Sequence, residues 1–158
     1  MNPMLHTAPT DRVRANTWPA VTARLDADTQ LRLRHASASP SKDELNRRIA
    51  ALDREWPFDR VLETEAALMG LAGLGLGVAT DKRLLALPAF VSAMLLLHAT
   101  HGWYPLLPLF RRLGVRTQDE IDRERYGLKA IRGDFAVLPP SNSPAAHRAA
   151  AAWEAVCA

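Results

Sequence analysis

Two histidines and a glutamate are the residues of this sequence most capable of chemistry. His98 and His101 lie three positions apart and therefore share one face of a helix. If the chain reverses direction near residue 82, His98 comes close to Ala66 and His101 comes close to Glu63. Because imidazole and carboxylate groups are common metal ligands, His98, His101 and Glu63 could bind a transition metal. The alternative is that these groups only contact water at the edge of an apolar helix pair.

Small residues form a regular stripe along the first of these helices. Ala66, Gly70, Gly73 and Gly77 follow one another at spacings of four, three and four, which places them on one helix face. In lipid, such a stripe lets two helix backbones approach closely. We expect this seam to join copies of the chain into a homo-oligomer through the hairpin. The alternative is that it packs against the chain's own return helix.

The remaining residues predict neither a reaction nor a cofactor. The glycine pattern of residues 73–77 is not GxGxxG and no strand precedes it, which argues against dinucleotide binding. Cys157 is the only cysteine, so no intrachain disulfide can form. The 20 Lys and Arg residues are mixed with 17 Asp and Glu residues rather than gathered in a basic stripe, which argues against nucleic acid binding. We therefore expect a non-enzymatic protein without a cofactor.

The elements that hold these residues are two helices that are apolar on every side. Between Ala66 and Phe110 the only charged residues are Asp81, Lys82 and Arg83, which form a turn between helices over residues 66–80 and 84–102. A helix that is apolar all round lies in a large core or in lipid, and a spanning helix needs about 20 apolar residues. Both stretches are short. A membrane hairpin therefore has an alternative, a soluble helical homo-oligomer that buries the hairpin and binds a hydrophobic ligand or partner.

The residues that flank the hairpin favour the membrane. Basic residues are more frequent near its two outer ends than at its tip, which is the bias expected when both termini are cytoplasmic. The outer set comprises Arg47, Arg48, Arg54, Arg60, Arg111, Arg112 and Arg116. Aromatic residues occur where the helices would meet the membrane surface, namely Trp56, Phe58, Trp103 and Tyr104. Residues 1–10 lack the pattern of a signal peptide, and we expect an inner-membrane protein with both termini in the cytoplasm.

Amphipathic helices are predicted on both sides of the hairpin. Ser41–Glu44 and Thr117–Glu120 have the pattern of capping boxes, in which a hydroxyl and a carboxylate accept hydrogen bonds from free helix amides. Apolar stripes follow each box: Leu45, Ile49, Leu52 and Trp56 before Pro57, and Ile121, Leu128 and Ile131 before Gly133. The sequence predicts a short helix over residues 28–36. Leucine and arginine alternate over residues 31–34, however, and this pattern suits a strand equally.

The predicted fold class is therefore all-α, an apolar two-helix transmembrane hairpin flanked by amphipathic helices. We expect three consecutive segments. A polar helical arm occupies residues 1–58, the hairpin with the segment after it occupies residues 59–116, and a charged helix with an alanine-rich tail occupies residues 117–158. Asp59 is expected to cap the first helix of the hairpin.

The end of the hairpin resembles the YgaP-like inner-membrane family. The resemblance is carried by His101-Gly102-Trp103-Tyr104-Pro105-Leu106-Leu107-Pro108 and by Leu113-Gly114-Val115-Arg116-Thr117, and it extends over about residues 60–117. In that family a two-helix transmembrane unit ends in a Gly-x-Cys-Pro-Leu segment. The resemblance implies a self-associating inner-membrane hairpin, and some relatives carry a rhodanese domain associated with sulfur transfer. This chain has no such domain, and it has Tyr104 where the family has cysteine, which argues against a thiol role there.

The stretches that flank the hairpin resemble those of a longer bacterial subgroup of uncharacterised function. They are Ser41-x-x-Glu44 before the hairpin and Arg123-Glu124-Arg125-Tyr126-x-Leu128-Lys129-x-Ile131-Arg132-Gly133-Asp134-Phe135 after it. These observations favour a scaffold or accessory protein in the inner membrane, with a protein partner that the sequence does not name. The alternatives are the soluble homo-oligomer and a metal- or sulfur-handling protein that uses His98, His101 and Glu63.

Overall fold

The computed structural model describes residues 11–38 and 41–157, and these residues form helices with no strand among them. The all-α fold class predicted from the sequence is confirmed. In chain order the α-helices are α1 (Arg12–Ala15), α2 (Pro19–Ala38), α3 (Lys42–Leu52), α4 (Phe58–Ala79), α5 (Ala86–His101), α6 (Leu107–Arg112), α7 (Gln118–Arg132) and α8 (Ala145–Cys157). Two 3₁₀ helices, η1 (Lys82–Leu85) and η2 (Asp134–Val137), precede α5 and follow α7.

The chain divides into two compact units, each assembled from two separate stretches. The hairpin unit contains the residues up to Asp26 together with Trp56–Glu120, and the arm unit contains Ala27–Glu55 together with the residues from Ile121 onward. This grouping differs from the three consecutive segments expected from the sequence. The N-terminal stretch contributes to both units, and the start of α7 belongs to the hairpin unit.

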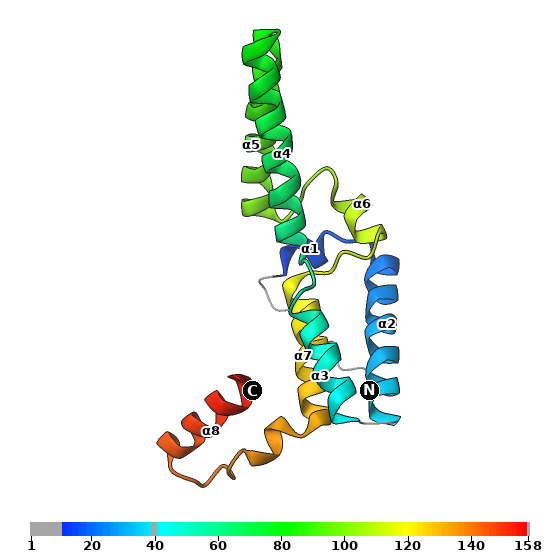
Figure 1. Cartoon of the computed structure of the whole chain (residues 1–158), viewed down its shortest axis with the longest axis vertical. Helices are drawn as coiled ribbons and strands as arrows, with labels where there is room; N and C mark the ends of the chain where they lie inside the picture. Colours follow the sequence, from blue (N-terminus) through cyan, green and yellow to red (C-terminus); the bar gives the residue numbers. More distant parts are fainter. Residues whose placement is uncertain (1–10, 39–40, 158) are drawn as a thin grey trace. The chain divides into compact units, whose positions relative to one another are not determined.

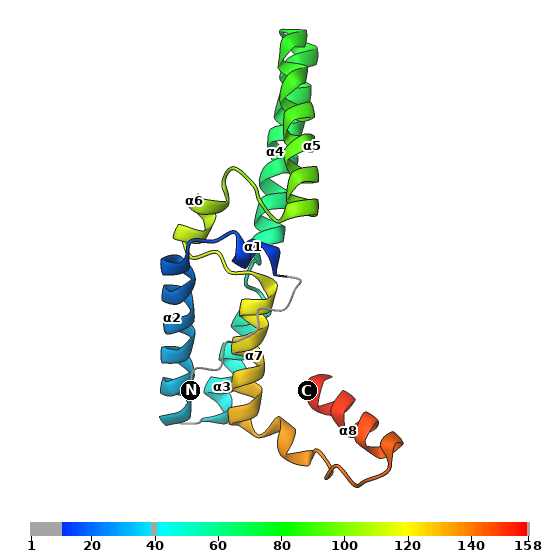
Figure 2. The same cartoon turned by 180° about the vertical axis from the view of Figure 1, so that it is seen from behind.

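Helices α4 and α5 form a long antiparallel hairpin (Figure 1), and the view from behind shows them side by side along the same length (Figure 2). Helix α4 begins at Phe58 with Pro57 in the N-cap position, so Asp59 lies in the first turn instead of capping the helix. A carboxylate in the first turn still interacts favourably with the helix dipole. At the tip, the Asp81 carboxylate accepts a hydrogen bond of 2.9 Å from the Arg83 amide and so caps η1.

The arm unit is built around the contact between α3 and α7. Its core combines residues of both predicted stripes, since Leu45, Ile49 and Leu52 lie in one buried cluster with Ala36, Ile121 and Leu128. Each of the leucine and isoleucine side chains contributes about 1.5–3 kcal/mol when it is buried. Trp56 does not join this core, because α3 ends at Leu52; it is 45% exposed and belongs to the hairpin unit.

Helix α2 is longer than the sequence indicated. It runs without interruption from Pro19 to Ala38, so the strand alternative for residues 31–34 is wrong. The alternation does not mark one buried face, because Leu31 is 53% exposed while Arg32 and Leu33 both contact α7. Leu33 packs against the core of the arm unit, while Arg32 forms an ion pair of 2.8 Å with Glu124.

The two predicted capping boxes differ. At the start of α7, the Thr117 hydroxyl accepts a hydrogen bond from the Glu120 amide (3.3 Å), and the Glu120 carboxylate accepts one from the Thr117 amide (3.0 Å). This box is confirmed. At the start of α3, Ser41 occupies the N-cap position, but its side chain makes no capping hydrogen bond.

Candidate functional site

The outward surface of the hairpin is apolar and uncovered. The most apolar 18-residue stretch of α4 is 22% buried, and that of η1 and α5 is 6% buried. Both helical segments are long and apolar enough to cross a membrane. Large exposed side chains occur on both helices, among them Leu68, Leu71, Leu74, Leu76, Val78, Phe90 and Leu96. Because a core helix of a soluble monomer would bury such residues, this surface requires lipid or another protein chain to cover it.

The small-residue seam faces the return limb of the same hairpin, which consists of η1 and α5. Ala66, Gly73 and Gly77 are buried, whereas Gly70 is half-buried with open space beside it. A Cβ atom at Gly73 would lie 2.7 Å from Pro88 Cδ, and one at Gly77 would lie 2.7 Å from Leu85 Cδ2. The seam therefore permits close contact within the hairpin, which is the alternative that the sequence left open. Homo-oligomerisation through the hairpin stays a prediction.

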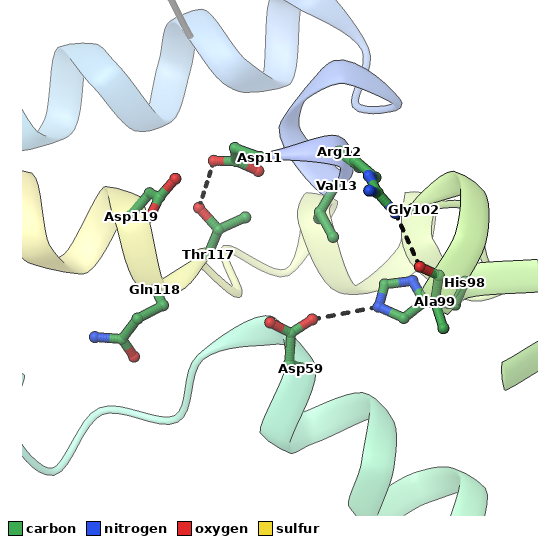
Figure 3. Close-up of a pocket in the computed structure, with 10 residues that line it drawn as sticks. All are labelled: Asp11, Arg12, Val13, Asp59, His98, Ala99, Gly102, Thr117, Gln118 and Asp119. Carbon is green, nitrogen blue, oxygen red and sulfur yellow. Dashed lines mark hydrogen bonds and ion pairs between the residues drawn. The ribbon is translucent and has the colours of Figure 1, made fainter. Parts of the chain in front are cut away.

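The structure does not assemble the metal site predicted from the sequence. The partner of His98 is Asp59, whose Oδ1 lies 3.3 Å from His98 Nε2 (Figure 3). His101 and Glu63 are exposed, and His101 Nδ1 contacts the Thr100 hydroxyl at 2.7 Å. Within residues 11–38 and 41–157, no group of three His, Cys, Asp or Glu side chains is placed to hold a metal ion.

The register of the hairpin explains this correction. Helix α4 already ends at Ala79, before the expected turn near residue 82. The return limb then starts with η1, and a 3₁₀ helix rises about 2.0 Å per residue compared with 1.5 Å in an α-helix. Both features move the residue that faces His98 toward the N-terminal end of α4, so that His98 meets Asp59.

His98 and Asp59 line an open cavity of about 280 Å³ at the base of the hairpin. Figure 3 shows that the cavity lies where α4, α5, the segment around α1 and the start of α7 come together. Its polar lining includes Asp11 and Asp119, and Asp11 already accepts hydrogen bonds from the Arg14 amide (2.8 Å) and the Thr117 hydroxyl (2.9 Å). Part of this lining therefore serves to join elements of the hairpin unit.

The segment around α1 also provides hydrogen-bond donors for the carbonyl groups at the C-terminal end of α5. Arg12 Nη1 donates to the carbonyl oxygens of Ala99 (2.9 Å) and Thr100 (3.0 Å), and Asn16 Nδ2 donates to that of His101 (2.9 Å). The last carbonyl groups of a helix have no partner within the helix, and a cation there interacts favourably with the helix dipole. Residues distant in sequence thus satisfy the end of an apolar helix that would otherwise expose its backbone.

Two of the four aromatic residues expected at a membrane surface are core residues instead. Phe58 is 0% exposed and Tyr104 is 4% exposed, and both belong to a cluster with Val13, Leu62 and Leu107. The Tyr104 hydroxyl donates to Glu65 Oε2 at 2.9 Å. Burial, together with the neighbouring carboxylate, raises the pKa of Tyr104 to about 12, so its hydroxyl stays protonated at neutral pH. The other two, Trp56 and Trp103, are 45% and 41% exposed.

A buried ion network lies beside this cluster and joins α1, α6 and α7. Arg111 is 1% exposed, and its guanidinium donates to both carboxylate oxygens of Glu120, each at 2.7 Å. Arg14 Nη1 donates to Glu120 Oε1 at 2.8 Å and also pairs with Asp26. The remaining bonds of Arg111 go to the Thr17 hydroxyl and the Val115 carbonyl oxygen, each at 2.9 Å.

The network keeps its members charged. Burial alone would raise the pKa of Glu120, but the hydrogen bonds and charges of Arg111, Thr117 and Arg14 outweigh burial and lower it. Burial opposes the charge of Arg14 in the same way, and its bonds to Asp26 and Glu120 raise the Arg14 pKa nonetheless. Because each charge is compensated by a partner inside the network, we assign the network a structural role.

Sequence reasoning found only part of this network. The capping box identified Glu120, but Arg111 was counted among the basic residues that flank the membrane. Arg111 and Arg112 are adjacent, and only the position of Leu107 one helical turn before Arg111 hints that Arg111 faces inward. Arg14 and Asp26 carried no signal, because their partners are distant in sequence.

Comparison of the chain with known protein families, curated proteins and solved structures finds no match in any of the three. The resemblance to the YgaP-like family therefore stays an expectation from the sequence.

Proposed function

We propose that this chain is a membrane-anchored scaffold or accessory protein of the inner membrane, in which α4 and α5 cross the bilayer as a hairpin. The observation that carries the proposal is the uncovered apolar surface of these two helices, whose most apolar stretches are only 22% and 6% buried. In lipid this surface is stable, whereas in water it would favour aggregation.

The distribution of charge supports an orientation with both termini in the cytoplasm. Lys82 and Arg83 are the basic residues at the tip, while the exposed residues Arg54, Arg60 and Arg112 flank the outer ends of the hairpin in the sequence. Arg111 does not count among the basic residues that favour this orientation, because the buried ion network neutralises its charge with Glu120. The bias remains in the direction that retains the outer ends on the cytoplasmic side.

The proposed role is non-enzymatic. The hairpin serves as the anchor, and the arm unit, with its own core around α3 and α7, is the part available to a partner. The resemblance to YgaP-like proteins agrees with a membrane hairpin and supplies no activity for this chain. Self-association of the anchor stays part of the proposal.

Fractionation of cell membranes tests the anchor. The wild-type chain should remain in the membrane pellet after extraction with alkaline carbonate and should dissolve only in detergent. The double variant Leu74→Arg/Phe90→Arg places two charges on the exposed hairpin surface, at an expected cost of about 2.5–3.5 kcal/mol each at the bilayer centre. It should be lost from the pellet. Leu31→Arg, at an exposed position of the arm unit, is the control and should remain there.

A wild-type chain found in the soluble fraction as a defined oligomer would contradict the anchor and favour the soluble homo-oligomer. Orientation is tested separately through Cys157, the single cysteine, which is exposed. A membrane-impermeant thiol reagent should leave Cys157 unlabelled in intact cells. It should label Asp81→Cys in a Cys157→Ser background, and the opposite pattern would reverse the orientation.

A further inference from the structure

Helix α6 has one face in the core and another that nothing covers. Leu107 and Arg111, one turn apart, are both 1% exposed. Leu109 and Leu113, also one turn apart, are 50% and 72% exposed. Two large apolar side chains next to each other on the outward face of a short helix form an exposed apolar patch, and such patches mark surfaces that contact another molecule.

A tryptophan and two arginines adjoin this outward face. Trp18 is 64% exposed, and the Arg112 guanidinium lies over its ring at 5.4 Å from the centroid. Arg24 Nη2 donates to the Arg112 carbonyl oxygen at 2.9 Å, which brings Arg24 to the end of α6. We call the residues Trp18, Arg24, Leu109, Arg112 and Leu113 the α6 face.

The two arginines of the α6 face differ from the buried arginine next to them. Arg111 is neutralised by Glu120. Across residues 11–38 and 41–157, no ion pair joins Arg24 or Arg112 to a carboxylate. Two exposed guanidinium groups near one helix end thus have donors available, and guanidinium binds phosphate through two parallel hydrogen bonds.

The α6 face continues the proposed membrane surface. Figures 1 and 2 both show α6 beside the base of the hairpin, at the level where α5 ends. Leu106, Leu107 and Phe110 pack on the same cluster as Phe58 at the start of α4, which fixes this position within the hairpin unit. Trp103, in the segment that leads from α5 to α6, is also exposed. Tryptophan and arginine are typical of the layer in which lipid headgroups lie.

We infer that the α6 face is a second membrane contact and that it binds the phosphate groups of anionic phospholipids. Leu109 and Leu113 enter the boundary between headgroups and acyl chains, Trp18 lies at headgroup level, and Arg24 and Arg112 hold the phosphate. This inference rests on the proposed membrane anchor, since the hairpin brings the face to the bilayer. It adds a preference for the type of lipid, which the hairpin alone does not provide.

Quenching of Trp18 fluorescence by brominated lipids tests the inference on the full chain. Trp56, Trp103 and Trp153 are replaced by Phe, and the protein is reconstituted into vesicles of phosphatidylcholine and phosphatidylglycerol. Either the anionic or the neutral lipid carries bromine, at equal mole fractions. Quenching should be stronger with brominated phosphatidylglycerol, and added salt should reduce the difference.

The variant Arg24→Gln/Arg112→Gln should lose this preference, by roughly fivefold in local lipid enrichment for each arginine. Arg34→Gln/Arg47→Gln is the matched control, because it removes two exposed charges from the arm unit, and it should keep the preference. Carbonate resistance is measured in parallel for all proteins and should not change.

The outcomes separate the inference from the anchor. A chain that fails to insert contradicts the proposed function itself. If the wild type inserts and Trp18 is quenched equally by both lipids, or if the arginine variant keeps the preference, the inference is overturned while the anchor stands. If the chain inserts and neither lipid quenches Trp18, the α6 face points away from the bilayer and binds something other than lipid, which also overturns the inference.

Discussion

The upper part of the hairpin and its base use the same two helices but different interactions. In the upper part, α4 contacts the return limb through Gly73 and Gly77, and the outward side chains are apolar and exposed. At the base, the same hairpin rests on a cluster of aromatic and aliphatic residues next to the buried charges of Arg111, Glu120 and Arg14. The packing of the upper part therefore depends on the close fit of the two helices, and the packing of the base depends on charges that compensate each other.

This difference follows from the solvent that each region is proposed to meet. Helices in lipid gain nothing from burying apolar surface against each other, so they depend on close backbone approach. The base lies next to α1, α6 and the start of α7, which carry charged side chains, and these charges are stable there only because each has a partner. We therefore expect the upper hairpin to be sensitive to side-chain size and the base to be sensitive to charge.

Loss of charge at the base should have the largest effect. Glu120→Gln leaves the buried Arg111 without a carboxylate and leaves Arg14 with Asp26 alone, and breaking a buried pair costs about 3–5 kcal/mol. Thermal unfolding of the protein in detergent micelles measures the change. Asp53→Asn breaks a surface pair with Arg125 and should cost less than about 1 kcal/mol. Equal effects of the two variants would mean that the network is not important for stability.

Acid should act through the same carboxylate. The pKa of Glu120 is lowered in the folded protein, so its stabilising contribution is complete above its unfolded pKa of about 4.3. The contribution is lost as the pH falls through the lower pKa of the folded state. Thermal unfolding as a function of pH should therefore show an acid-side decline in the wild type that is smaller in Glu120→Gln. A decline of the same size in both proteins would assign it to other carboxylates.

A larger side chain in the upper hairpin should have an intermediate effect. Gly73→Leu introduces atoms where Pro88 Cδ already lies 2.7 Å from the Cβ position, and overpacking typically costs about 1–3 kcal/mol. Gly75→Leu is the control, because nothing lies within 4 Å of its Cβ position. Crosslinking of copies in native membranes should be equal for both variants. Weaker crosslinking in Gly73→Leu alone would return the seam to a role in self-association.

The smallest effect is expected for a single hydrogen bond at the base of the hairpin. Tyr104→Phe removes the hydrogen bond to Glu65 and should lower the stability by about 1 kcal/mol. Because the folded pKa of Tyr104 is about 12 and the unfolded value is about 10, this contribution is present below pH 10 and disappears toward pH 12. Alkaline unfolding curves should show this decline in the wild type and not in Tyr104→Phe. Parallel curves for the two proteins would contradict the assignment.

The sequence by itself determined the local features of this protein. The confinement of charge to Asp81, Lys82 and Arg83 within residues 66–110 identified the hairpin, and the stripes of α3 and α7 identified the core of the arm unit. These patterns consist of helical periodicity and of a stretch without charge. Both can be read from residues that are close together in the sequence. The capping box at Thr117 was visible for the same reason.

Only the tertiary structure decided which distant residues meet. The register of the hairpin placed His98 against Asp59, because a few residues at the turn displace every contact farther along two antiparallel helices. Arg111 and Arg112 are neighbours of the same type, yet one is buried against Glu120 and the other lies over Trp18. A difference of one position turns a side chain by about 100° around the helix axis. The side of α6 that faces the core is set by α1 and α7, which no local pattern in the sequence reports.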